Sequence, residues 1–131
     1  MKKMFLILMI LVAVPSLQAL ANEYAEKGKA GNFNVEVKMD RNPPGRGNND
    51  MRIYIEDKGR QPVTDAHVEV QYLMPSFPGR APMMEYNTIA KISGTHYRAQ
   101  MDLNMAGEWT VILSVARAGK TETMQFSFVV K

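Results

Sequence analysis

The sequence predicts an all-β protein, an antiparallel β-sandwich of about seven strands that follows an export signal. Short segments between Phe33 and Val130 alternate apolar with polar side chains, which is typical of strands with one buried face. Clusters of Gly, Pro, Asn and Asp separate these segments about every 8 to 12 residues. No segment of the mature chain repeats apolar residues at helical spacing beyond one turn.

Seven segments carry the alternation, and we expect their apolar series to share one interior. Trp109 belongs to one such series, and we expect it to fill the core rather than stack on a ligand. A small closed barrel is the structural alternative. The expected strands cover residues 33–39, 51–56, 66–72, 86–92, 97–103, 109–115 and 124–130, with a long loop over 42–49 and a hairpin joining the fourth and fifth strands.

The first 21 residues have the pattern of a secretory signal peptide. Lys2 and Lys3 precede an apolar run, and small residues around Ala21 provide a cleavage site. The apolar run is about half of the ~20 residues that a membrane-spanning helix needs. We therefore expect a periplasmic or extracellular protein, which contacts the membrane only if the signal is retained. Residues 22–31 are expected to form a flexible lead, and residues 32–131 one domain.

Charge and cysteine content exclude several classes of protein. Removal of Lys2 and Lys3 from the 16 basic residues leaves 14 against 13 acidic ones, interspersed along the chain. No basic run could neutralise a series of phosphates, so we expect no nucleic-acid partner. The chain has no cysteine, and hence no disulfide, no lipidated cysteine and no thiolate ligand.

Catalytic motifs are missing as well. The sequence has no glycine-flanked serine elbow, no zinc-binding histidine pair and no phosphate-binding glycine loop. His67 and His96 fall on the outward series of their strands and lack ligand spacing, so we expect them to be solvated. The sequence thus indicates a binding protein and not an enzyme.

Methionines near a proline-rich segment are the strongest functional signal. Met74, Met83 and Met84 lie on the connection of residues 74–84, whose three prolines exclude an interior strand, so we expect this connection to be exposed. Thioethers are soft ligands that select Cu(I), and unlike thiolates they form no disulfides. Two interpretations stay open: these methionines bind copper(I), or they fold back and cap the end of the sandwich, where their flexible side chains fill gaps.

Several short motifs occur in the order typical of one family. They are Gly59-x-x-Pro62-Val63-x-x-Ala66-x-Val68, Met74-Pro75 with Pro78-Gly79 and Pro82-Met83, Gly94-x-x-Tyr97-x-Ala99, and Met105-Ala106-Gly107-Glu108-Trp109. In this order they resemble the YtkA-like domain, over nearly the whole mature chain. The resemblance implies an immunoglobulin-like β-sandwich outside the cytoplasmic membrane, often near copper-handling and heavy-metal efflux systems.

The chain departs from the family pattern in the methionine loop. The family often has a methionine-proline-x-methionine-proline-glycine-methionine run, whereas here Phe77 and Arg80 replace the second and third methionines. Two thioethers are therefore lost, and a cation stands where a metal would bind. This departure weakens the copper interpretation and leaves the fold prediction intact.

We therefore predict an exported, non-enzymatic accessory protein with a copper(I) site at Met74, Met83 and Met84. Its partner would be an envelope or membrane protein, such as an efflux or copper-handling component. The alternative is an interaction module that docks on such a partner through the same loop. Phe77 would then be an apolar anchor and Arg80 an orienting charge.

Overall fold

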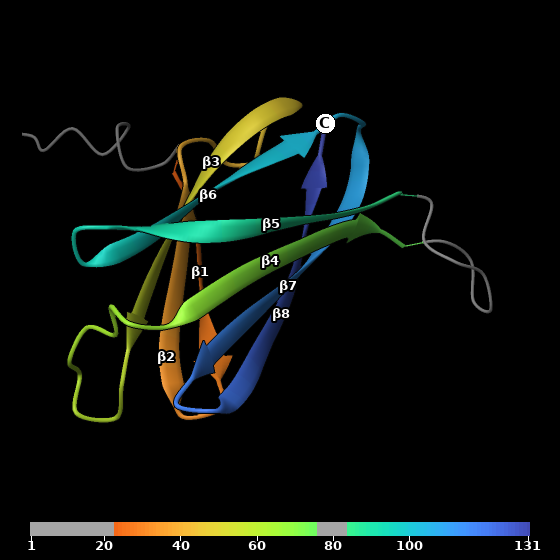
Figure 1. The fold of residues 1–131 in the computed structure, drawn as a ribbon. Coiled ribbons are helices and arrows are strands. Elements are labelled where there is room, and N and C mark those ends of the chain that lie inside the picture. Colours follow the sequence, from red (N-terminus) through yellow and green to blue (C-terminus); the bar gives the residue numbers. More distant parts are fainter. Residues whose placement is uncertain (1–22, 76–83) are drawn as a thin grey trace, which may run out of the picture.

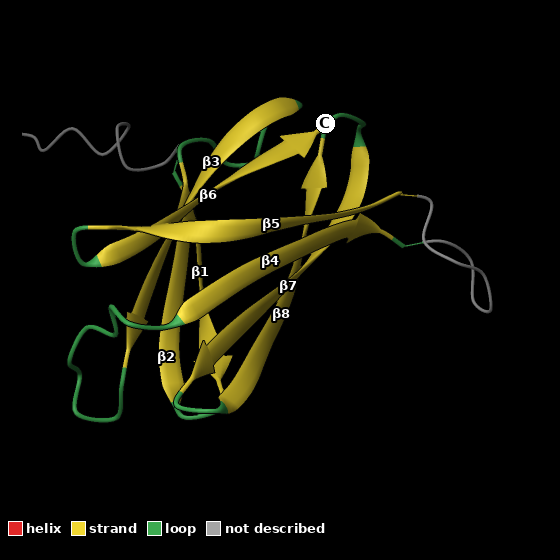
Figure 2. Ribbon diagram, in the orientation of Figure 1, coloured by secondary structure: helices red, strands yellow, loops and turns green. Residues whose placement is uncertain are grey.

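The computed structural model describes residues 23–75 and 84–131, and all of their regular structure is β-strand (Figure 2). These residues contain no helix that could cross a membrane. The predicted signal peptide lies outside the described residues. The strands are β1 (Tyr24–Ala30), β2 (Phe33–Met39), β3 (Gly47–Glu56), β4 (His67–Met74), β5 (Met84–Ser93), β6 (His96–Leu103), β7 (Gly107–Arg117) and β8 (Lys120–Val130).

The eight strands are antiparallel to their neighbours and follow the order β1-β2-β3-β6-β5-β4-β7-β8 (Figure 1). β5 belongs to both halves of this arrangement. Its first part, up to Ala90, pairs with β4, and its last part, from Lys91 to Ser93, pairs with β6 as a hairpin. The predicted hairpin of the fourth and fifth strands is thereby confirmed.

The first and last strands of the order come together through side chains. The ring of Tyr24 on β1 lies 6.4 Å from that of Phe126 and 5.6 Å from that of Phe128, both on β8. Among the described residues, β1 pairs only with β2 and β8 only with β7. The sheet is therefore rolled almost into a barrel, with a seam of aromatic rings in place of a last ladder.

The predicted apolar series form the interior. Trp109, Val111, Leu113 and Val115 of β7 are completely buried, which confirms the core position of Trp109. Three methionines, Met39, Met51 and Met101, are completely buried as well. Unbranched thioether side chains fill irregular gaps, so they suit a core that no disulfide reinforces.

The expected flexible lead was wrong, because β1 occupies most of it and raises the strand number to eight. The inward positions of β1 include Glu26 and Gly28, which are not apolar side chains. The alternation on which the strand predictions rest is therefore interrupted in this strand. Glu26 accepts a hydrogen bond from the Tyr24 hydroxyl (3.3 Å). Gly28 lies close to β8, since a Cβ there would be 2.7 Å from Met124 Cε and would require that side chain to move.

Several strand ends also differ from the predicted bounds. β3 begins at Gly47, inside the predicted loop, while β4 extends to Met74 and β5 begins at Met84. Asn49 explains the first difference, because its side-chain amide donates to the carbonyls of Gly45 (2.7 Å) and Gly47 (3.0 Å) and holds this polar stretch in place. Polar residues that bond to the backbone conceal a strand from a hydrophobicity pattern.

Tyr97 ties β6 to the segment between β3 and β4. Its buried hydroxyl donates to the carbonyl of Val63 (2.9 Å) and accepts from the backbone N–H of Ala66 (3.0 Å). Burial raises the pKa of Tyr97 above its ordinary value. One side chain thereby satisfies two backbone groups of a connection that has little regular structure.

We expect Tyr24→Ala to lower the free energy of unfolding by about 3 kcal/mol, because it removes a buried ring from the seam. Urea unfolding followed by tryptophan fluorescence measures this loss. Ala25→Ser, at the exposed neighbouring position of β1, serves as the control and should change the stability by less than about 0.5 kcal/mol. Equal stabilities of the two variants would show that β1 does not hold the sheet together.

We expect Tyr97→Phe to cost about 1 to 3 kcal/mol at pH 7, because two buried backbone groups lose their partner. The fold favours the neutral phenol, so the contribution of Tyr97 is complete below its unfolded pKa of about 10 and is lost as pH rises through the higher folded pKa. The stability difference between the wild type and Tyr97→Phe should therefore shrink above about pH 10. Denaturant titrations from pH 7 upward test this, and a pH-independent difference would contradict it.

Candidate functional site

The structure brings two of the predicted site residues together. Met74 is the last residue of β4 and Met84 the first of β5, and the two are direct partners across the ladder. Figure 1 shows these strand ends side by side. Met83, Phe77 and Arg80 lie outside the described residues, so their predicted roles stay predictions.

The two methionines differ in exposure. Met74 is only 8% exposed and belongs to the core, whereas Met84 is half-buried and packs against it. The expectation that Met74 lies on an exposed connection was therefore wrong. Directly opposed residues on one face of a sheet have Cβ atoms about 5 Å apart, so both thioethers can reach a common point. Met74 is thus a buried member of the pair and Met84 a partly exposed one.

Three aromatic rings lie beside this methionine pair. Tyr72 and Tyr86 form the neighbouring cross-strand pair on the same face, with ring centroids 5.3 Å apart. The ring of Trp109 lies 5.9 Å from that of Tyr72 and 6.4 Å from that of Tyr86. We call Met74, Met84, Tyr72, Tyr86 and Trp109 the methionine-aromatic cluster. Sulfur in contact with aromatic rings is favourable, and the rings give the thioethers an apolar support.

Gly107, the first residue of β7, makes room for Met74. A Cβ on Gly107 would lie 2.6 Å from Met74 Cε, and its φ of +133° is a conformation that only glycine adopts easily. This glycine therefore allows the methionine to pack directly on the backbone where β7 begins.

The Tyr86 hydroxyl connects Met84 with the segment between β6 and β7. It donates to Met84 Sδ over 3.9 Å and accepts from the side-chain amide of Asn104 at 3.0 Å. This pair of contacts positions the Met84 thioether relative to that segment. The alternation of side chains predicts only that Tyr86 belongs to a strand. It does not reveal the contacts of its hydroxyl with Met84 and Asn104.

The donor atoms of the cluster are those of a soft site. Within residues 23–75 and 84–131, no group of three or more His, Asp or Glu side chains could hold a harder cation. Thioethers next to aromatic rings fit Cu(I), which prefers soft ligands, and do not fit Mg²⁺ or Ca²⁺. The residues present are therefore compatible with copper(I).

The two histidines lie away from this cluster. His67 begins β4, at the end opposite to Met74, is exposed, and has its Nε2 3.0 Å from Glu69 Oε1. His96 begins β6 and stacks on Tyr54 with ring centroids 5.0 Å apart. The expected solvated position is confirmed for His67, while His96 is half-buried by its aromatic neighbour.

Charged side chains on the outer face of β2, β3 and β6 largely neutralise one another. Arg52 lies 2.7 Å from Asp40 and 2.9 Å from Glu23, and Arg98 pairs with Asp50. The hydrogen bond that Arg52 donates to the Asp40 carboxylate raises the pKa of Arg52 above its usual value. This face does not present the uniform positive charge that binding to nucleic acid would need.

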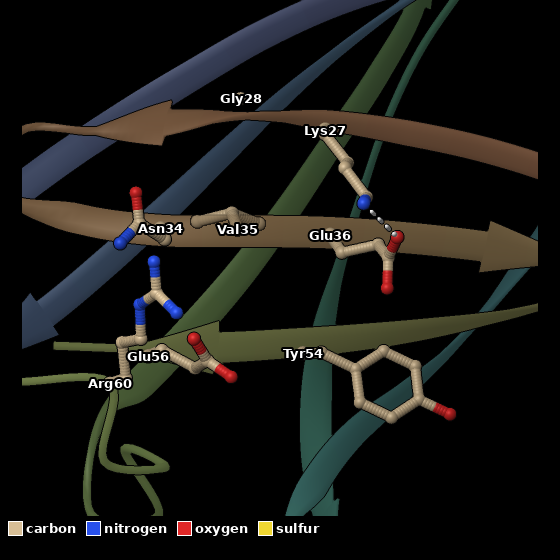
Figure 3. Close-up of a pocket in the computed structure, with 8 residues that line it drawn as sticks. All are labelled: Lys27, Gly28, Asn34, Val35, Glu36, Tyr54, Glu56 and Arg60. Carbon is tan, nitrogen blue, oxygen red and sulfur yellow. Dashed lines mark ion pairs between the residues drawn. The ribbon is translucent and has the colours of Figure 1, made fainter.

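A shallow depression of about 400 Å³ lies on the outer face of β1, β2 and β3 (Figure 3). Two cations, Lys27 and Arg60, and two anions, Glu36 and Glu56, line it beside Tyr54. Lys27 Nζ and Glu36 Oε2 are 3.6 Å apart, as the dashed line shows. Charges of both signs on an open surface are typical of a solvated face and select no particular ligand.

Arg60 enters this depression from a tight turn. Its φ of +62° is unusual for a residue with a side chain. The Asp57 carboxylate holds the turn by accepting from the backbone N–H groups of Gly59 (2.9 Å) and Gln61 (3.0 Å). The turn fixes the backbone position from which the Arg60 side chain extends.

The rolled antiparallel sheet and its methionine-bearing end define a class of small all-β domains, and the comparison with known proteins agrees with this class. The YtkA-like family model matches residues 27–114, so the chain belongs to the YtkA-like family. The match begins inside β1, in keeping with its place in the domain. The YtkA-like family is not a known family of enzymes.

Among solved structures, the chain is similar to the PmoD soluble domain from Methylocystis sp. ATCC 49242 (Rockwell). The TM-score is 0.55 at 16% sequence identity, and the alignment covers 82% of this chain and 96% of the other. At this identity the likeness concerns the fold alone. No curated protein matches the chain significantly.

We expect Gly107→Ala to lower the free energy of unfolding by about 2 kcal/mol, because alanine is strained at positive φ and its Cβ collides with Met74. In a Met74→Ala background the collision disappears and only the backbone strain remains. The double variant should therefore be more stable than the sum of the single effects predicts, with a coupling of about 0.5 to 3 kcal/mol. Denaturant unfolding of the four proteins measures this coupling, and strict additivity would exclude the contact.

Proposed function

We propose that the chain is an exported, non-enzymatic binding protein of the cell envelope that holds Cu(I) at the methionine-aromatic cluster. The observation that carries this proposal is the direct pairing of Met74 and Met84 beside three aromatic rings, in a chain without cysteine. Soft thioethers prefer Cu(I) to harder cations, and aromatic rings near sulfur are favourable neighbours.

The different exposure of the two methionines supports transient binding. A half-buried Met84 can meet an incoming metal ion, and the buried Met74 offers a second sulfur already held in place by Gly107. Met83 is the third predicted ligand and directly precedes β5. Thioethers are neutral, so the metal can arrive and leave without proton exchange at its ligands.

The location and the absence of catalysis belong to the same proposal. The signal-like residues 1–21 support a periplasmic or extracellular protein. The family and the missing catalytic motifs support a protein that binds and delivers. Its partner would be an envelope or membrane protein that handles copper or exports heavy metals.

We infer that the two halves of the rolled sheet correspond to the two layers of an immunoglobulin-like sandwich. The strand order supports this, because β5 alone joins the half formed by β1, β2, β3 and β6 to the half formed by β4, β7 and β8. In such sandwiches binding residues gather where the strands end, which is where Met74 and Met84 lie.

We expect the purified mature protein to bind Cu(I) under anaerobic reducing conditions, as measured by competition with a chromogenic Cu(I) chelator. Met84→Leu keeps the side-chain volume but removes the sulfur, so the affinity should fall about tenfold or more. Met124→Leu, whose sulfur lies against Gly28 on β1, is the matched control and should bind as the wild type does.

A wild-type protein that does not compete for Cu(I), or a Met84→Leu variant with unchanged affinity, would overturn the copper proposal. The rival, docking through Phe77, makes a different prediction. Phe77→Ala would then abolish capture of a cross-linked envelope protein in native membranes, with Cu(I) binding absent in the wild type.

A further inference from the structure

We infer that Met105, in the segment between β6 and β7, supplies a further thioether to the same site, and that Tyr86 positions it relative to Met84. The inference rests on the proposed Cu(I) function. With Met105, the site within the described residues would contain three thioether sulfurs from three chain segments: Met74, Met84 and Met105.

Met105 is much more exposed than the methionines of the core. Its side chain is 37% exposed, and it is one of four large apolar residues in the described part of the chain that face solvent. The buried methionines of the sheet fill gaps in the core, and this explanation does not apply to Met105. Its exposure leaves its sulfur available to a ligand.

The residue before Met105 is tied to Met84. The Asn104 side-chain amide donates to the Tyr86 hydroxyl at 3.0 Å, and that hydroxyl donates to Met84 Sδ at 3.9 Å. Tyr86 thus makes a polar contact with each of the two segments. The start of the β6–β7 connection is therefore held at the end of the sheet where Met84 lies.

The other side of Met105 is tied to Met74. Gly107 follows two residues later and lies so close to Met74 Cε that a Cβ on this glycine would be only 2.6 Å away. In addition, the indole N–H of Trp109 donates to the Met105 carbonyl at 3.0 Å. The segment that carries Met105 is thereby fixed before, at and after this residue.

The three thioether sulfurs have the ligand chemistry that Cu(I) prefers. All are neutral and soft. Two thioethers alone would leave it open to competing ligands, so a third sulfur raises affinity and selectivity. Because the β6–β7 segment is already positioned, little ordering is needed when the metal binds.

The first experiment compares Met105→Leu with the control Met124→Leu, and uses Cu(I) alone as the probe. We expect Met105→Leu to weaken Cu(I) binding about tenfold in the chelator competition. X-ray absorption of the loaded variant should show one sulfur fewer around copper than in the wild type. Met124→Leu should change neither quantity.

The outcomes separate this inference from the proposed function. If the wild type binds Cu(I) and Met105→Leu retains the same affinity and sulfur number, Met105 is not a ligand and the copper function stands. If the wild type binds no Cu(I), the inference and the proposed function both fall.

A spectrum of the protein labelled with ¹³C at the methionine methyl groups provides a second readout. Addition of Ag(I), a redox-stable substitute for Cu(I), should shift the Met74, Met84 and Met105 signals and leave the buried Met39 and Met101 signals in place. Single Met→Leu variants assign the signals. An unshifted Met105 signal at saturation would overturn the inference even if a variant is unstable.

Tyr86→Phe tests the positioning role. It removes the hydroxyl that joins Asn104 to Met84 but leaves every sulfur and the aromatic ring in place. We expect weaker Cu(I) binding with an unchanged sulfur number, together with a broader Met105 methyl signal. Binding and line width identical to those of the wild type would exclude this role.

Discussion

The packing of aromatic rings around Trp109 is the interaction on which the rest of the structure depends. Trp109 is completely buried, contacts Tyr72 and Tyr86 from two other strands, and reaches the β6–β7 segment through its indole N–H. A chain without cysteine has no covalent bond to hold strands together, so such a large side chain carries much of the cohesion. The same rings support the methionines, and fold and candidate site therefore share their central residue.

Alternation of side chains predicted most of the fold because the interior is lined by apolar residues at every second position. All seven expected strands are present, and Trp109 lies where its series places it. β1 escaped prediction because its inward positions include Glu26 and Gly28. Glu26 accepts a hydrogen bond from Tyr24, two residues before it, and Gly28 lies close to Met124, which is distant in sequence. An alternation of apolar residues signals neither contact.

The candidate site could be predicted only in part. Met74 and Met84 were identified from composition and loop chemistry, and the structure places them side by side. Sequence alone gave Met74 the wrong environment, because the prolines after it suggested a loop, whereas β4 continues two residues past its predicted end and carries Met74 into the core. The contact of Asn104 with Tyr86 spans 18 positions and depends on the strand order, so no local pattern could disclose it.

The seam between β1 and β8 gives the domain an unusual mechanical property. Backbone ladders join all the other neighbouring strands, but in the described part of the chain β1 and β8 meet through side-chain packing, which includes the rings of Tyr24, Phe126 and Phe128. Separating rings breaks no backbone hydrogen bond, so the first slow opening motions should concentrate at this junction and expose the amides of β1 to solvent exchange. The junction that opens most easily thus lies along β1, away from the β4–β5 ladder that pairs Met74 with Met84.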